Sequence, residues 1–131
     1  QVERAEELVA RKREIFSWYN KGLSDCPVVL NHEPDGTLNT YWMVTALLPI
    51  ELGFDRAEIA ETLSKEGIDS RPFFHPLSSL PAYDGASEDA HKRNPNAYAI
   101  SPRGINLPSA LCLEHPQVER VCAVFKKALG G

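Results

Sequence analysis

One short stretch, Ser70 to Tyr83, gathers the residue types best suited to chemistry in this chain. Arg71 is a permanent cation with the geometry to bind a phosphate or a carboxylate. His75 could hydrogen-bond a polar ligand group or move a proton near neutral pH. Three prolines fix their own φ angles and push the residue before each of them toward an extended conformation. The stretch is therefore predicted to be a stiff, irregular, partly buried path that presents these side chains.

Two interpretations of this stretch remain open from residue types alone. In the first it forms a ligand-facing wall, since functional residues are concentrated on irregular segments that a rigid scaffold positions. In the second it is a connection stiffened by proline, whose Phe73, Phe74 and Tyr83 fill the core. Arg71 has a matching alternative, a buried structural ion pair.

Other residue patterns give weaker evidence for a functional site than residues 70–83 do. The four histidines and three cysteines lack the spacings of structural zinc sites, so we expect no metal. No glycine-rich phosphate loop occurs, and Ser78 and Ser79 lack the glycine frame of a serine nucleophile. We expect His91 to be solvated in a polar loop, His115 to cap the last helix, and Cys122 to fill the core.

Length and composition describe an ordinary globular chain. The 131 residues suffice for a single domain, 1–131, with its own core. A net charge of −4 without a basic run argues against nucleic acid as a partner. No apolar run has membrane-spanning length and no signal-peptide pattern opens the chain. Three cysteines without metal spacing predict reduced thiols and a cytoplasmic location.

In the first half of the chain, apolar residues recur with helical periodicity over Val2–Leu23. This helix has no N-cap signature, which favours a chain that continues upstream, although a cut made in cloning would look the same. Residues 28–48 are predicted to form two antiparallel strands joined by a turn at Asp35-Gly36. The second, Thr40–Leu48, is apolar at both parities, as in a central strand covered on both sides.

Asp55 and Glu58 can form a capping box that starts the next helix, and Gly67 can end it. A short third strand should follow Ile68, and Asp84–Asn96 is predicted to be a loop. Further elements are one or two helical turns (96–101), an extended piece (104–108) and an amphipathic helix from Pro116. The predicted fold class is α+β, a small, mostly antiparallel sheet with helices packed on it.

Three segments carry a family resemblance: residues 68–83 (IDSRPFFHPLSSLPAY), 96–101 (NAYAIS) and 103–109 (RGINLPS). Together they resemble the C-terminal region of the DegT/DnrJ/EryC1/StrS family, whose members are PLP-dependent nucleotide-sugar aminotransferases. The perosamine-synthetase-like members look most similar. Arg11, Arg13 and Tyr19 look like residues of the family's long helix, and residues 41–44 (YWMV) look like its central small-domain strand.

The resemblance implies the small domain of a fold-type I PLP-dependent aminotransferase. The large domain of such an enzyme supplies the Schiff-base lysine, the acid that pairs with the pyridine nitrogen and most of the phosphate cup. None of the six lysines here has the family's asparagine–lysine setting. The chain alone is therefore expected to have no catalytic residues, no cofactor and no transaminase activity.

The resemblance also places Arg71, His75, Ser78 and Tyr83 on the wall that faces the cofactor and the nucleotide-sugar in a complete enzyme. Many relatives carry a histidine at the position of Ser78, so this chain departs from the pattern where the sugar approaches, and His75 is a candidate substitute. In the complete enzyme the partners would be glutamate and a keto-sugar nucleotide, and the enzyme would be a homodimer.

Two alternatives accompany this expectation. The chain could be a stand-alone binding or dimerisation module, whose apolar surfaces pair with a second copy. Its parent could instead be one of the family's PLP-dependent sugar dehydratases, which replace the Schiff-base lysine. The upstream sequence separates the aminotransferase from the dehydratase, and the oligomeric state of the chain tests the module.

Overall fold

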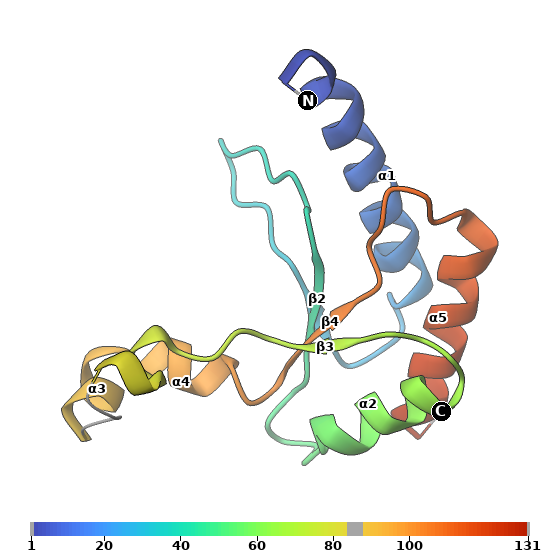
Figure 1. Cartoon of the computed structure of the whole chain (residues 1–131). Helices are drawn as coiled ribbons and strands as arrows, with labels where there is room; N and C mark the ends of the chain where they lie inside the picture. Colours follow the sequence, from blue (N-terminus) through green and yellow to red (C-terminus); the bar gives the residue numbers. More distant parts are fainter. Residues whose placement is uncertain (1, 84–87, 131) are drawn as a thin grey trace.

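The sheet is small and antiparallel throughout. The computed structural model describes residues 2–83 and 88–130. Within them, four strands pair in the order β1-β2-β4-β3, each with its neighbour in antiparallel direction (Figure 1). Their bounds are β1 Val29–Leu30, β2 Val44–Leu47, β3 Arg71–Pro72 and β4 Gly104–Leu107. The predicted α+β class and its mostly antiparallel sheet are confirmed.

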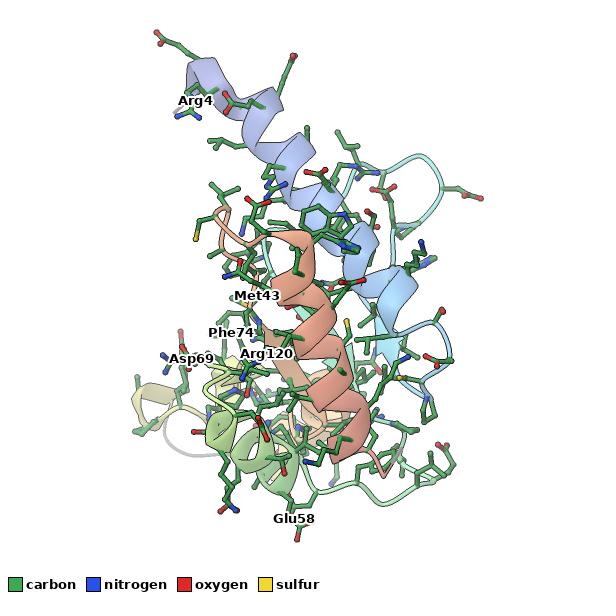
Figure 2. The ribbon with its side chains drawn as sticks, turned by 90° about the vertical axis from the view of Figure 1, so that its right-hand side faces the viewer. Arg4, Met43, Glu58, Asp69, Phe74 and Arg120 are labelled. Carbon is green, nitrogen blue, oxygen red and sulfur yellow. The ribbon has the colours of Figure 1, made fainter. Side chains whose placement is uncertain are left out.

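Three longer helices form a layer against this sheet. They are α1 (Ala5–Gly22), α2 (Arg56–Lys65) and α5 (His115–Ala128), and a 3₁₀ turn, η1 (Val2–Arg4), precedes α1. Helix α5 packs against both α1 and α2, and the first turns of α1 extend beyond α5 in both views (Figures 1 and 2).

The remaining short elements form a separate projection, which we call the arm (residues 73–83 and 88–100). It contains η2 (Leu77–Ser79), η3 (Pro81–Tyr83), α3 (Glu88–Arg93) and α4 (Pro95–Ile100). In Figure 1 the arm leaves the sheet at β3, runs away from α1, α2 and α5, and returns into β4.

The core lies between the sheet and the three long helices. Because side chains alternate along a strand, Val44 and Ala46 of β2 share one face with their neighbours Ile105 and Leu107 of β4. All four are buried in one cluster with residues from the helices, including Ile15, Tyr19, Ile59, Leu63, Val118 and Phe125. Each fully buried large side chain contributes roughly 1.5–3 kcal/mol relative to leaving it exposed.

Helix α1 also holds the loop that leads from β4 to α5. The buried Tyr19 donates its hydroxyl hydrogen to the Pro108 carbonyl at 2.8 Å. Arg11 donates to the carbonyls of Leu111 and Leu113, and Lys12 donates to that of Ser109. Polar side chains of α1 thus satisfy carbonyl groups of a loop that has no ladder partners of its own.

The predicted cap at Asp55 and helix end at Gly67 are confirmed, but within the described residues Glu58 does not complete the predicted capping box. Asp55 accepts a hydrogen bond from the Ala57 amide at 2.7 Å, and Gly67 has the positive φ of +70° expected just after a helix. The predicted cap at His115 is wrong. Glu114 is the N-cap, in a capping box with Gln117, because these two side chains bond reciprocally to backbone amides.

The second predicted strand is shorter than expected. Tyr41 has a φ of +47°, which a strand does not tolerate, so the strand begins only at Val44. The expectation that this strand is covered on both sides is also wrong, because Thr45 and Leu47 are only half-buried. The fully buried strand is β4, the piece predicted merely as extended.

The polar stretch Asp84–Asn96, predicted as a loop, contains helix α3 and the first residues of α4. Residues 84–87 lie outside the described part. Ala90 is buried and its carbonyl accepts hydrogen bonds from both the amide and the side chain of Asn94. Local packing and these bonds outweigh the polar, turn-like composition.

Candidate functional site on the arm

The arm begins with a tight contact between β3 and β4. The Phe73 amide donates to the Gly104 carbonyl at 2.9 Å, and the Phe73 side chain lies directly over Gly104. A Cβ atom at Gly104 would come within 2.5 Å of the Cβ of Phe73, so only glycine fits here. This contact sets the direction in which the proline-rich stretch leaves the sheet.

Further along the arm, three short elements meet at Tyr98 of α4. Its hydroxyl lies 3.1 Å from the Ser78 hydroxyl of η2, within hydrogen-bond distance. The ring of His91 in α3 stacks on the Tyr98 ring with centroids 3.6 Å apart. The expectation that His91 lies in a loop is wrong, because it lies in α3, but its side chain is exposed as expected while it stacks on Tyr98.

Beside this junction is an open hollow of about 420 Å³. Its lining combines two hydroxyl groups, an amide and apolar carbons, a mixture suited to a polar ligand with hydroxyl groups. The lining residues are Pro76, Leu77, Ser78, Tyr83, Asn94 and Ala97. Ser78 and Tyr83, two of the four predicted site residues, therefore share one surface.

Arg71 and His75 lie outside the lining of that hollow. Arg71 is exposed on β3, where its guanidinium donates to Asp69 at 3.0 Å in an ion pair that is about three-quarters exposed on both sides. The alternative of a buried ion pair is therefore wrong. His75 is also exposed. The structure thus brings together two of the predicted residues and leaves the other two on open surface.

The aromatic side chains of residues 70–83 do not fill the core, because they are largely exposed. Phe74 and Tyr83 are 55% and 61% exposed, and Phe73 is only half-buried. Phe74 stacks on Trp42, itself 60% exposed, with centroids 6.1 Å apart. Partial burial holds for the stretch as a whole, because Pro76 is buried and Ser78 and Ser79 are half-buried.

Sequence reasoning missed Tyr98, Asn94 and His91 as neighbours of the site. Ser78 and Tyr98 are twenty positions apart, a separation with no periodic signature. A partial signal existed: Asn94, the N-cap of α4, and Tyr98 are four positions apart, one helical turn, and the Tyr98 amide donates to the Asn94 carbonyl. Residues 96–101 stood out by resemblance, but nothing in them indicated that Tyr98 contacts Ser78.

A second hollow, of about 460 Å³, lies between the first turns of α1 and the segment before β2. Its lining is apolar apart from Lys12 and Thr40, and includes Val2, Ala5, Leu8, Val9, Trp42 and Leu111. The Lys12 ammonium donates to the carbonyls of Trp42 and Ser109, and partial burial lowers its pKa. No carboxylate belongs to this lining.

Within residues 2–83 and 88–130, no cluster of three or more histidine, cysteine, aspartate or glutamate side chains is placed to hold a metal ion. In the same described part, no helix has both the length and the apolar character needed to span a bilayer.

Comparison with known proteins decides the family. The sequence profile of the DegT/DnrJ/EryC1/StrS aminotransferase family matches residues 1–126. The chain belongs to this family. It is 35% identical to GDP-perosamine synthase of Vibrio cholerae over 126 residues, which are 96% of this chain and 34% of that protein. It is 34% identical to GDP-perosamine synthase of Escherichia coli O157:H7, over 93% of this chain and 32% of that protein.

Solved structures of aminotransferases share the fold. The PMP-form of a putative sugar aminotransferase, Spr1654, from Streptococcus pneumoniae matches with a TM-score of 0.84 at 24% identity, over 99% of this chain and 33% of that one. DesI, solved in the presence of its TDP-sugar product, matches with a TM-score of 0.84 at 22% identity, over 98% and 33%. The chain thus spans about a third of the length of the relatives it matches.

The family depends on PLP, so we tested whether the described residues fit that cofactor. Lys12 is the one lysine that lines any of the hollows described above, and its amine is bound to two backbone carbonyls. The same lining offers neither an acid for a pyridine nitrogen nor a set of amides for a phosphate. Lys65 and Lys126 are engaged in ion pairs on the surface. The residues that line these two hollows therefore do not fit the cofactor.

Proposed function

We propose that this chain is the small domain, residues 1–131, of a PLP-dependent nucleotide-sugar aminotransferase. The observation that carries the proposal is the match to GDP-perosamine synthase, at 35% identity along 96% of this chain but only 34% of that protein. The complete enzyme would move an amino group from glutamate to a keto-sugar nucleotide. It would work as a cytoplasmic homodimer.

The proposed division of labour follows from the positions of the four candidate residues. Ser78 and Tyr83, on the hollow of the arm, would face the sugar, because hydroxyl groups pair well with sugar hydroxyls. Arg71, an exposed cation at the edge of the sheet, would meet an anionic group such as a phosphate. His75, exposed between Phe74 and Pro76, would contact the substrate from the same stretch.

We further propose that the chain does not transaminate alone. Lys12 is held by carbonyl oxygens and no acid lines the same hollow, so this hollow offers neither a free amine for the cofactor nor the charge that activates it. Catalysis would require the rest of a complete enzyme.

A chimera tests both parts of the proposal. Residues 1–131 replace the matching third of the Vibrio cholerae GDP-perosamine synthase, and amino transfer from glutamate to that enzyme's keto-sugar nucleotide is measured. We expect the chimera to form amino-sugar product and the isolated chain, given PLP and both substrates, to form none. A folded, cofactor-loaded chimera without turnover, or turnover by the isolated chain, would overturn the proposal.

A second candidate function rests on the exposed apolar side chains near the first turns of α1. Val2, Leu38 and Trp42 are 91%, 72% and 60% exposed, and Leu38 lines a further apolar hollow with Ala5 and Val9. Such a surface would pair with a copy of the same chain if the chain acts as a stand-alone module.

Sedimentation of the isolated chain across a concentration series tests this second candidate. If the chain is such a module, it should form a dimer. The variant Trp42→Ser should weaken this dimer more than Leu77→Ser, although Leu77 is the more exposed of the two apolar side chains. A monomer at all concentrations would remove the candidate.

A further inference from the structure

Among the candidates for a further role, one buried polar side chain stands apart from the hollows and the exposed patches. Asn106 in β4 is 4% exposed, yet it does not belong to the apolar core. Because Ile105 and Leu107 point toward the helices, the intervening Asn106 points to the opposite face of the sheet. A buried amide must satisfy its hydrogen-bonding groups, so its partners define what it holds.

Both ends of the Asn106 amide are engaged, on different strands. The Thr45 hydroxyl of β2 donates to its Oδ1 at 2.7 Å, and its Nδ2 donates to the Pro72 carbonyl of β3 at 3.4 Å. The Pro72 carbonyl can only accept, which fixes the amide orientation with nitrogen toward β3. On the far side, the Thr45 amide donates to Oδ1 of Asn31, just after β1, at 2.7 Å.

These contacts form a continuous polar chain across the whole sheet, from Asn31 through Thr45 and Asn106 to Pro72. The last link adds to the backbone ladder. The Phe73 amide donates to the Gly104 carbonyl, so the adjacent facing pair, Pro72 and Ile105, lies where an antiparallel ladder makes no backbone bond. The Asn106 side chain supplies a bond between β4 and β3 at that position.

We propose that Asn106 is the positioning residue of the arm. By holding the Pro72 carbonyl, it fixes the point from which residues 73–83 leave the sheet. Its value for substrate binding rests on the proposed function, in which Ser78 and Tyr83 face the sugar. The link itself belongs to this chain and is measurable without any substrate.

Two near-isosteric variants separate positioning from general stability. Asn106→Leu removes the bond to Pro72, whereas Thr45→Val removes the hydroxyl bond to Asn106 and leaves the link to Pro72 in place. Backbone hydrogen exchange is followed at Phe73, whose amide donates to Gly104, and in α1 and α5 as references. We expect Asn106→Leu to speed exchange at Phe73 about tenfold relative to the references, and Thr45→Val to leave that ratio unchanged.

A measurement on the unaltered chain keeps the proposal testable if Asn106→Leu does not fold. The two Nδ2 protons of Asn106 should exchange with water at least about tenfold more slowly than those of the exposed Asn96. Equal exchange of the two side-chain amides would overturn the proposal. An equal rise in exchange at Phe73 and in the helices, in both variants, would do the same.

The outcome is independent of the chimera assay. The Asn106 side-chain amide could exchange slowly and Asn106→Leu could speed exchange mainly at Phe73 while the chimera is inactive. In that case the positioning role stands and the proposed function fails. If the chimera is active and Asn106 is unprotected, the proposed function stands and the positioning role fails.

Discussion

Arg13 of α1 and Glu33, in the connection between β1 and β2, form a two-pronged ion pair. The Arg13 Nη2 donates to Oε1 of Glu33 at 3.0 Å, and its Nη1 donates to Oε2. The same Nη1 also donates to the Asn39 carbonyl at 2.6 Å, while the Asn39 amide donates to Glu33 at 2.7 Å. One guanidinium therefore closes a ring of bonds that fastens the β1–β2 connection to α1.

This ring predicts a pH-dependent loss of stability. The Arg13 hydrogen bond, helped by the Asn39 amide, lowers the pKa of Glu33 from 4.5 to about 2. A carboxyl group with a lowered folded-state pKa stabilises the fold fully above its ordinary pKa, and this contribution is lost as pH falls from about 4.5 toward 2. Glu33→Gln should lower Tm at pH 7, and its difference from the unaltered chain should shrink across that pH window.

Thermal unfolding followed by circular dichroism between pH 7 and pH 2.5 measures this difference. Glu61→Gln is the matched control, because Glu61 pairs with Lys65 on the exposed face of α2 and makes a single contact. Its effect on Tm at pH 7 should be smaller than that of Glu33→Gln. Equal effects of the two variants would show that the ring around Arg13 adds nothing to an ordinary surface pair.

Tyr41 shows where prediction from sequence reached its limit. The aromatic, β-branched run from Thr40 indicated a strand, and β-propensity alone gave no reason to interrupt it. In the structure the Tyr41 ring stacks on Phe16 with centroids 3.7 Å apart, while its backbone takes a φ of +47°. The contact with a helix twenty-five positions earlier decides the conformation, and no local pattern encodes that contact.

Gly104 and Phe73 provide the second prediction. A methyl group at position 104 would lie 2.5 Å from the Cβ of Phe73, closer than real Cβ contacts allow, and backbone pairing prevents the two strands from separating freely. Gly104→Ala should therefore destabilise the chain by about 1–3 kcal/mol, as overpacking of a tight contact does. Urea unfolding at pH 7 measures this loss.

A matched glycine gives the control for that loss. Gly67 has open space around its missing Cβ but a φ of +70°, so Gly67→Ala reports backbone strain without a clash. We further expect Gly104→Ala, but not Gly67→Ala, to raise the rate of hydrogen exchange at the Phe73 amide. Unchanged exchange at Phe73 would contradict the steric account of this contact.

The three cysteines give the third prediction, an order of reactivity. Burial raises the pKa of the Cys122 thiol from 9.0 to about 11, which lowers its thiolate fraction about a hundredfold, and the side chain is 4% exposed. Burial also raises the pKa of Cys26, whereas Cys112 is exposed. Iodoacetamide at pH 8 should modify Cys112 first and Cys122 last.

Peptide mass spectrometry over a time course measures this order, and labelling in 8 M urea shows the rates without the fold. Cys122 labelled as fast as Cys112 under native conditions would contradict its place in the core. The expectation from sequence that Cys122 fills the core is confirmed by its burial, because helical periodicity directly reports which face of α5 is apolar.

Some features of the candidate site could be predicted from the local sequence, and others depend on contacts between distant residues. Prolines and aromatic residues marked the stretch 70–83, and their local stiffness predicted a segment outside regular structure. The sequence could not indicate that Ser78 and Tyr83 share a hollow while Arg71 and His75 do not, because that depends on where α3 and α4 pack against η2. Because the composition of residues 84–96 is polar, the sequence predicted a loop there and gave no sign of α3 or of the stacking of His91 on Tyr98.

The hydroxyl pair of Ser78 and Tyr98 gives the fourth prediction. If their 3.1 Å contact is a hydrogen bond, Ser78→Ala and Tyr98→Phe remove the same interaction, so the double variant should lose less stability than the sum of the two. The expected coupling is about 1 kcal/mol, the usual net contribution of one such bond. Urea unfolding of the four proteins measures it.

Ser79 supplies the control for this cycle, because its hydroxyl donates to the Pro76 carbonyl within the same turn and not to Tyr98. Ser79→Ala and Tyr98→Phe should therefore be additive within about 0.3–0.5 kcal/mol. Additivity of Ser78→Ala with Tyr98→Phe would show that η2 and α4 are not joined by this bond. If the bond is present, Tyr98→Phe in the chimera should raise the KM for the keto-sugar nucleotide more than the KM for glutamate, because Ser78, which lines the hollow, loses its hydrogen-bond partner.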